Sequence, residues 1–377
     1  MRTFPSLFRL FAIVLALVAL SGCSALSQTM KASPSLMNAM GLADYPLKDL
    51  ERKYTNSESR WLEVDGVRIH YRDVGEGHPV VLVHGIMSSL HTWDGWVDEL
   101  RRNYRVIALD VPSYGLTGAL PDHLDYSDET LLSLFSKFVD ELELERFSIA
   151  GNSMGGYIAA VYAAQNPQRV AKLVLLDPIG YPQETPWLFD VATLPGIRTL
   201  GRYVAPPLLV TLNVRDVYGD PSRLSQENLA RYIHMSQRPG AKSAYMETMI
   251  ELKRRSTLEV PLPFYRIKAP TLLMWGELDR WVPVQLTERW KADIPHLELI
   301  IYPGVGHMPM EEIPYESVQD AKAFLADLAS TPSSRSDAAR QTSQGISDLE
   351  RLLQGETLET PEPVVESELE EMAPLEL

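Results

Sequence analysis

Short continuous apolar runs recur along the middle of the chain, and stretches with a helical pattern separate most of them. The runs cover residues 79–83, 106–109, 147–150, 173–176, 271–275 and 297–301. Runs of this length are typical of strands that are buried on both faces of a sheet. Helical patterns lie between them over residues 93–102, 128–141 and 154–164. Strands that alternate with helices predict an α/β fold with a mostly parallel central sheet flanked by helices.

The alternation begins with an antiparallel hairpin and is interrupted once. Asp65-Gly66 lies between two alternating runs, which is a strong hairpin signal. Residues 181–262 contain helical stretches but no convincing buried strand. We therefore expect a core made of residues 55–180 and 263–330. Residues 181–262 would form a helical cap over the carboxyl ends of the strands, where open α/β sheets place their ligands.

The first residues have the features of an export signal. A charged start precedes an apolar run over residues 10–20, which is shorter than the roughly 20 residues of a membrane-spanning helix. The run ends in Leu-Ser-Gly-Cys23, which resembles the bacterial lipobox, where the cysteine is acylated and becomes the first residue after cleavage. We predict a lipoprotein signal peptide over residues 1–22, a lipid on Cys23 and a tether over residues 23–54.

These features predict a location in the bacterial cell envelope. Ser24 resembles the sorting residue of outer-membrane lipoproteins, which favours the outer membrane. An uncleaved anchor in the inner membrane stays open, because residues 10–26 carry no charge and reach the lower limit of a spanning helix. Either way, we expect the amino terminus to tether the protein to a membrane.

Charge and cysteine content exclude several classes of protein. The net charge of −15 argues against nucleic acid as a partner, because phosphate binding needs a basic surface. The single cysteine excludes a disulfide framework and a cysteine-rich zinc module. Residues 331–377 hold 11 acidic and three basic residues, which predicts an acidic disordered tail. Nothing in the sequence indicates the oligomeric state.

A glycine-rich motif, Gly151-Asn-Ser-Met-Gly-Gly, follows one predicted strand and opens a predicted helix. This is the setting of a nucleophile elbow, in which Ser153 lies at the apex of a strained turn. Gly151 and Gly155 would let the strand and the helix pass closely. The N–H of Met154, at the helix start, would stabilise an oxyanion.

A nucleophilic serine needs a base, and the base needs a carboxylate to orient it. On a fold of this kind the expected chain order is serine, acid, histidine. His307 follows the last predicted strand, and Asp279 follows the strand before it. Glu277 and Asp177 are competing carboxylates, but we favour Asp279 because its loop is the natural neighbour of the histidine loop.

The segment His84-Gly85-Ile86 ends an earlier predicted strand. The N–H of Ile86 would be the second oxyanion donor. We expect His84 to hold this loop through hydrogen bonds, with Gly85 supporting it, rather than to act as a second base. The other histidines lack metal-ligand spacing, and no phosphate-binding glycine loop follows a strand. We therefore expect neither a metal nor a nucleotide cofactor.

Over roughly residues 55–330 these motifs resemble the α/β-hydrolase superfamily. Residues 110–117 resemble its D-x-P-G-x-G-x-S/T turn, with Ser113 at a usual glycine position. The elbow sequence is shared by certain bacterial lipases and by carbon–carbon bond hydrolases of ring-cleavage products. The latter usually have a tryptophan after the histidine and a glycine-rich oxyanion loop, whereas this chain has Met308 and Ile86-Met87. A membrane-anchored, phospholipase-like bacterial lipase or esterase is the closest resemblance.

The resemblance implies a serine hydrolase that cleaves carboxylic esters through a Ser-His-Asp acyl-enzyme mechanism. The membrane anchor and an apolar cap favour fatty-acyl lipid esters, although the apolar cap residues could equally form the cap's own core. Two alternatives stay open. One is a carbon–carbon bond hydrolase or perhydrolase on the same fold, and the other is a non-catalytic lipid-binding envelope lipoprotein.

Overall fold

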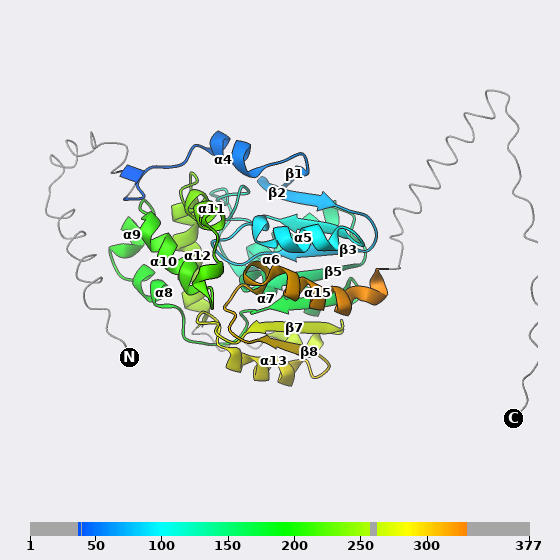
Figure 1. Ribbon diagram of the computed structural model, residues 1–377. Coiled ribbons are helices and arrows are strands. Elements are labelled where there is room, and N and C mark those ends of the chain that lie inside the picture. The colour runs from blue at the N-terminus through cyan, green and yellow to red at the C-terminus, as the bar shows by residue number, and fades with distance from the viewer. Residues whose placement is uncertain (1–36, 39, 257–261, 330–377) are drawn as a thin grey trace, which may run out of the picture. The chain divides into compact units, whose positions relative to one another are not determined.

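The computed structural model describes residues 37–38, 40–256 and 262–329 (Figure 1). The predicted signal peptide, Cys23 and the predicted acidic tail lie outside these residues. No helix within the described ranges is long and apolar enough to cross a membrane.

An eight-stranded sheet forms the centre of the described domain. Its spatial order is β1-β2-β4-β3-β5-β6-β7-β8. The strands are β1 (Ser59–Val64), β2 (Val67–Val74), β3 (Pro79–Val83), β4 (Arg105–Leu109), β5 (Phe147–Asn152), β6 (Val170–Leu176), β7 (Thr271–Gly276) and β8 (Glu298–Tyr302). The pairs β1·β2 and β2·β4 are antiparallel, and all the other pairs are parallel. The predicted fold class is therefore confirmed.

Every residue of β3, β5 and β7 is buried, because helices cover both faces of the sheet. Helix α5 (Asp94–Leu100) packs against α15 (Pro314–Leu325), while α6 (Asp128–Glu141) packs against α7 (Met154–Gln165). The short helices α13 (Thr287–Asp293) and α14 (Pro309–Glu312) flank β8 in the sequence. Continuous apolar runs were the correct signal for these strands, since neither face meets water.

The first hairpin has the geometry that its turn residues favour. Val64 pairs with Val67, so Asp65 and Gly66 form a two-residue loop. Both have positive φ, 49° and 79°, as a type I′ turn requires. The turn matches the right-handed twist of β1 and β2 and thereby fixes their register.

The segment between β6 and β7 contains the helices of the cap. They are α8 (Trp187–Ala192), α9 (Ile197–Leu200), α10 (Pro207–Asp216), α11 (Gln226–Ser236) and α12 (Ala241–Ser256). No strand occurs in the part of residues 181–262 that the structure describes. These helices are green in Figure 1 and lie together at one end of the sheet.

Residues 40–54, which we call the N-terminal strap, pack along the cap before the chain enters β1. The strap includes α4 (Leu47–Tyr54), whose Leu50 is fully buried. Gly41 O accepts a hydrogen bond from Ala205 N at 3.1 Å, and Tyr45 N donates to Gln237 O at 2.7 Å. The described part of the predicted tether is thus fastened to the cap.

Candidate active site

Ser153 lies at a sharp turn between β5 and α7. Its φ of 55° and ψ of −118° lie outside the regions that L-residues ordinarily occupy. A conformation of this kind costs about 1–3 kcal/mol and persists only where the surroundings enforce it. A Cβ on Gly151 would lie 2.4 Å from Gly155 O, and one on Gly155 would lie 2.2 Å from Val83 O. Only glycine fits at either position, so the backbone around the serine is closely packed.

Two backbone donors flank the serine. Gly85 approaches so closely that a Cβ there would lie 3.0 Å from the Ser153 Cβ, which brings the loop after β3 against the elbow. Among the described residues, neither Ile86 N–H nor Met154 N–H donates to a protein acceptor. Met154 also begins α7, where the helix dipole favours negative charge. The pair can therefore receive a developing oxyanion.

His84 holds this loop in place through both ring nitrogens. Its Nδ1–H donates to Gly85 O at 2.7 Å, and its Nε2 accepts from Val111 N at 3.0 Å. Complete burial lowers the pKa of His84, because the charged imidazolium is disfavoured there. Because the Nε2 lone pair already accepts a hydrogen bond from Val111 N, His84 cannot accept a proton from a substrate.

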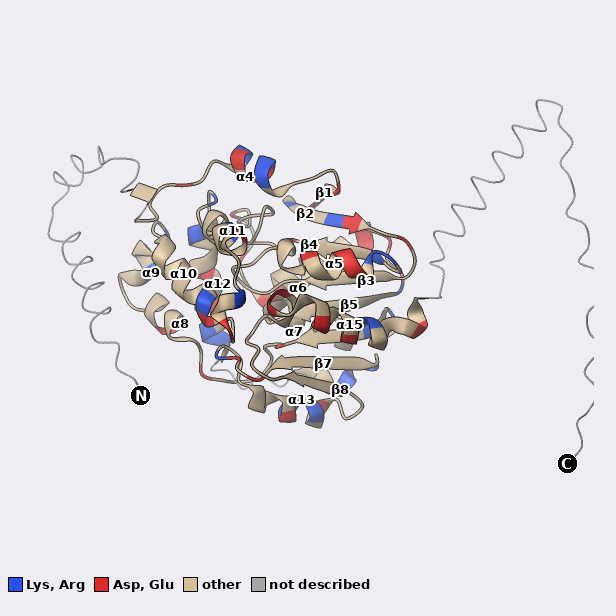
Figure 2. Ribbon diagram, viewed as in Figure 1, with Lys and Arg blue, Asp and Glu red and all other residues tan. Residues whose placement is uncertain are grey.

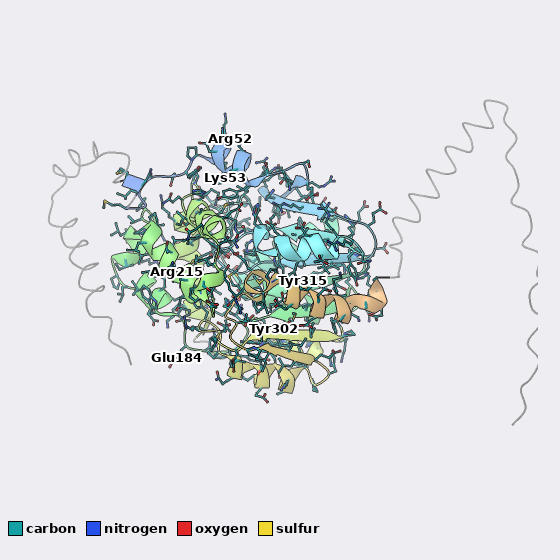
Figure 3. The ribbon with its side chains drawn as sticks, in the orientation of Figure 1. Arg52, Lys53, Glu184, Arg215, Tyr302 and Tyr315 are labelled. Carbon is teal, nitrogen blue, oxygen red and sulfur yellow. The ribbon has the colours of Figure 1, made fainter. Side chains whose placement is uncertain are left out.

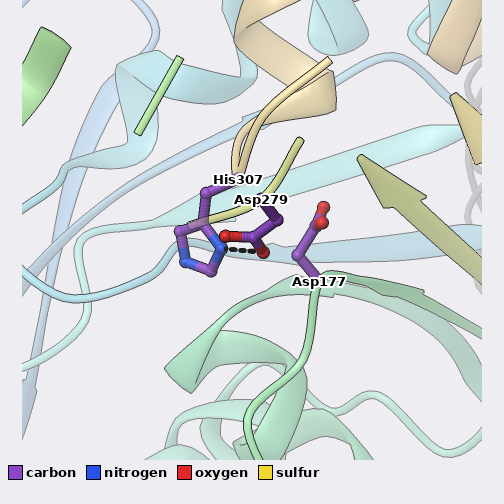
Figure 4. A group of neighbouring side chains, drawn as sticks. All are labelled: Asp177, Asp279 and His307. Atoms are coloured by element: carbon purple, nitrogen blue, oxygen red, sulfur yellow. Dashed lines mark hydrogen bonds and ion pairs between the residues drawn. The ribbon is translucent and has the colours of Figure 1, made fainter. Parts of the chain in front are cut away.

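His307 and Asp279 form a buried pair (Figure 4). Nδ1 of His307 lies 2.7 Å from Asp279 Oδ2. Asp279 Oδ1 accepts from Trp281 N at 2.7 Å and from Val282 N at 2.9 Å, so both carboxylate oxygens are fixed. The Trp281 ring stacks on the imidazole at a centroid distance of 6.0 Å. These contacts set the orientation of the imidazole and direct Nε2 away from the carboxylate.

Of the two competing carboxylates, Glu277 is exposed and accepts from Gly304 N at 3.2 Å, away from the imidazole. Asp177, at the end of β6, is different. It is fully buried, and its side chain lies beside those of Asp279 and His307 (Figure 4), with one polar atom from each of the three within 4.8 Å of the others. Sequence reasoning did not anticipate two adjacent carboxyls.

The environment of Asp177 favours its neutral form. Oδ1 accepts from Gly276 N at 2.9 Å, whereas Oδ2 is buried without a donor. Burial and the adjacent Asp279 charge raise the pKa of Asp177 well above its usual range. A protonated Asp177 can donate to Asp279, which satisfies both groups. Two carboxyls and an imidazole are also groups that can bind a metal ion, but the hydrogen bonds among these three side chains already explain why they lie together.

Asn152 connects the serine turn to the histidine loop. Its Nδ2 donates to His307 O at 3.0 Å and to Leu176 O at 3.1 Å. His307 N in turn donates to Val217 O, at the end of α10, at 2.7 Å. The histidine backbone is therefore fixed between the elbow and the cap. The only sequence signal for this role was the place of Asn152 next to the serine.

A cavity of about 530 Å³ adjoins the elbow, a size typical of small-molecule sites. Ser153 and Ile86 line it beside apolar and aromatic side chains, namely Leu132, Tyr157, Val161, Ile179, Phe189, Leu252, Leu262, Trp281 and Val282. Asp128 and Arg255, which form an ion pair, also line it. Among the described residues, the Ser153 hydroxyl has no hydrogen-bond partner, so it is free to turn toward the imidazole or a substrate.

A second serine–histidine–aspartate arrangement lies elsewhere in the domain. His70 Nδ1 is 2.7 Å from Asp110 Oδ2, and His70 Nε2 is 3.0 Å from Ser59 Oγ. Ser59 lies in the regular edge strand β1, away from a strained turn, and does not line the cavity next to Ser153. Asp110 also accepts from Leu90 N and Leu116 N, so we assign this trio a structural role.

The fold and this site define the class of protein. A family model described as the alpha/beta hydrolase fold matches residues 78–314. This chain therefore belongs to the alpha/beta hydrolase fold family.

Similar proteins include both hydrolases of 2-hydroxy-6-oxo dienoates and lipases. A 2-hydroxy-6-oxo-2,4-heptadienoate hydrolase of Pseudomonas putida is 29% identical, over 71% of this chain and 96% of its own length. A solved membrane phospholipase A, described as a bacterial virulence factor, has 27% identity and a TM-score of 0.63, covering 86% of this chain and 99% of that one. A putative lipase of Acinetobacter baumannii has 26% identity and a TM-score of 0.62, covering 76% of this chain and 97% of that one.

Proposed function

We propose that this protein is a serine hydrolase that cleaves carboxylic esters. Ser153 Oγ attacks the ester carbonyl, and His307 Nε2 takes the serine proton and delivers it to the leaving alcohol. Asp279 orients the imidazole and stabilises its charged form. The N–H groups of Ile86 and Met154 stabilise the tetrahedral oxyanion. Water activated by His307 then releases the acid and restores the serine.

The observation that carries this proposal is the combination of a strained, buried serine with a fixed His–Asp pair. Asn152 joins the two by bonding to the backbone of His307. The N–H groups of Ile86 and Met154 have no acceptor among the described residues, and Ser153 has a positive φ. Strain of this kind concentrates at functional sites.

We further propose fatty-acyl lipid esters as substrates. Apolar and aromatic side chains predominate in the cavity beside Ser153, which suits an acyl chain. The structural alignment with the membrane phospholipase A covers 86% of this chain. The predicted lipid on Cys23 would hold the enzyme beside its substrate at a membrane of the cell envelope.

Hydrolysis of a carbon–carbon bond is the second candidate, because relatives with that activity are about as similar in sequence as the lipases. A 2-hydroxy-6-oxononadienedioate/2-hydroxy-6-oxononatrienedioate hydrolase of Cupriavidus pinatubonensis is 32% identical. Ester and ring-cleavage dienone substrates compared side by side distinguish the two activities.

The test measures hydrolysis of p-nitrophenyl esters from butyrate to palmitate, and of a ring-cleavage dienone. Ser153→Ala should lower ester turnover by about 10³-fold or more. Ser59→Ala is the matched control, because it removes a hydroxyl from the other His–Asp pair, and it should retain activity. Ester turnover that survives in folded Ser153→Ala contradicts the proposal, and turnover confined to the dienone favours the second candidate.

A further inference from the structure

The cap carries a concentration of exposed apolar side chains. Half of the large exposed hydrophobic residues in the described chain lie on α8–α10 or the loops between them. They are Trp187, Leu194, Tyr203, Leu208 and Leu212, with exposed fractions from 39% to 65%. We call this set the apolar cap face. Such a concentration of exposed apolar side chains on one part of a domain points to an interaction site rather than an ordinary solvent-facing surface.

Helix α10 shows the feature most clearly. Its sequence is largely apolar, yet Val214 is its only buried residue. Leu208, Leu212 and Arg215 follow one another at helical spacing, and all three are exposed. The ribbons of α9 and α10 are mostly tan in Figure 2, whereas α13 carries charges of both signs. Helix α10 packs against α11 through its other side, so the side that carries Leu208 and Leu212 is uncovered among the described residues.

The charges around the apolar cap face suit an anionic surface. Residues 187–216, from the start of α8 to the end of α10, contain three arginines and two aspartates, in a chain whose net charge is −15. Both aspartates are paired, Asp190 with Lys253 at 2.6 Å and Asp216 with Arg280 at 3.4 Å. Among the described residues, Arg198 and Arg215 have no ion-pair partner, and both are exposed. Exposed arginines beside apolar side chains are typical of surfaces that contact anionic lipid.

The chain enters the described domain next to this face. Gly41 bonds to Ala205, which lies between Tyr203 and Leu208 in the sequence. The predicted lipid-bearing Cys23 precedes Gly41 by 18 residues, and an extended chain of that length reaches about 60 Å at most. A lipid anchor at Cys23 would therefore keep the apolar cap face within reach of the bilayer.

We propose that the apolar cap face docks onto the lipid bilayer. This inference rests on the proposed function, since docking would serve a hydrolase that takes its substrate from the membrane. Helix α8 links the two features, because it carries Trp187 and also places buried Phe189 in the wall of the cavity next to Ser153. A docked cap would hold the cavity close to the lipid layer and shorten the path of an acyl chain to the serine.

Trp187, which is 51% exposed, is a natural reporter for the test. The full-length protein is placed in phosphatidylethanolamine–phosphatidylglycerol vesicles, and tryptophan emission is compared between wild type and Trp187→Phe. Docking predicts that brominated acyl chains quench the emission that Trp187 contributes and that aqueous acrylamide does not. Quenching by acrylamide alone contradicts the proposal. If neither quencher reaches Trp187 and the protein is dimeric, a second copy covers the face and the proposal is wrong.

A pair of tyrosines provides a matched functional comparison. Tyr203 is 65% exposed on the apolar cap face, and Tyr315 is 67% exposed on α15 (Figure 3). Tyr203→Glu should lower hydrolysis of vesicle phospholipid by about tenfold and leave hydrolysis of soluble p-nitrophenyl butyrate unchanged. Tyr315→Glu should change neither rate. Equal effects of the two substitutions on vesicle hydrolysis contradict docking. If the wild type hydrolyses no ester, the proposed function fails, while the fluorescence result still decides the docking proposal.

Discussion

The carboxyl of Asp177 lies beside that of Asp279, and of the two it is Asp177 that is neutral. Asp279 is the charged member because it accepts two backbone N–H groups and the His307 ring. Asp177 has one backbone donor, and its second oxygen finds a partner only when it is protonated. Position at a strand end, which both residues share, therefore does not decide which carboxylate serves the histidine.

The two aspartates should respond differently to the same substitution. Asp177→Asn keeps a neutral group of the same shape that can donate to Asp279, so turnover should fall by less than about tenfold. Asp279→Asn removes the charge that orients and stabilises the imidazolium, and turnover should fall by about 10³–10⁴-fold. Steady-state kinetics of both variants on one soluble ester measures the difference. The reverse ranking would make Asp177 the catalytic acid.

Asn152 should affect the chemical step without contacting the substrate. Asn152→Ala leaves the His307 carbonyl without a donor and removes one of the two donors to Leu176 O, which keeps Ser153 N, so we expect a loss of about 1–3 kcal/mol in the free energy of unfolding. We expect kcat to fall and KM to change little, because the base is displaced. Asn152→Asp preserves the side-chain volume but replaces the donor with an acceptor, and it should be at least as harmful. A fully active Asp variant would rule out this positioning role.

The elbow glycines should tolerate no side chain. Gly151→Ala would place its Cβ 2.4 Å from a backbone oxygen that cannot move alone, so we expect a loss of at least about 1–3 kcal/mol in stability. Gly196→Ala provides the comparison, because its φ is 84° but nothing lies within 4 Å of the added Cβ. Its cost should come from the backbone alone, about 1–2 kcal/mol. Urea unfolding of both variants tests the ranking, and a smaller loss at Gly151 contradicts it.

Stability should fall as the pH is lowered from 7 to 5, partly because of His91. Burial lowers the pKa of His91 to about 3, against about 6.5 in an unfolded chain. Between these values the unfolded state binds more protons than the folded state, so acid favours unfolding. This one group should contribute a loss of about 2 kcal/mol at pH 5.

The substitution His91→Gln removes the titrating group while keeping an amide donor for Tyr54 O, to which His91 Nε2 lies at 2.9 Å. Unfolding temperatures of wild type and variant at pH 7 and pH 5 provide the comparison. The drop on acidification should be smaller in the variant. A residual drop is expected from His78, whose pKa burial lowers to about 4. An identical drop in both proteins contradicts the assignment to His91.

Elements with a local or periodic signal were predictable from the sequence. The helical pattern over residues 128–141 coincides with α6, and the Ser127 side chain accepts from Thr130 N at its start. The apolar runs gave the central strands to within a few residues, because burial on both faces leaves no other pattern. Residue order along the chain was enough to select Ser153, Asp279 and His307 as candidates.

Features that depend on contacts distant in sequence could not be predicted in this way. The protonation of Asp177 depends on a neighbour about 100 residues away. The apolar residues of α10 suggested a cap core or a lining for an acyl chain, but most of them remain outside the core. Ser113 has a φ of 91°, a backbone conformation that favours glycine, and a serine at this position gave no local sequence signal for it.

The N-terminal strap also determines the order in which parts of this protein can assemble. Its partners on the cap include Ala205, Gln237 and Lys242, the last of which bonds to Asp44 at 2.7 Å. Because these partners lie 160–200 residues further along the chain, the contacts between strap and cap can form only after the cap has been synthesised. Contacts of such high sequence separation slow folding. We therefore expect the strap to attach to the cap late in folding. Until then, no contact with the strap holds the cap in place.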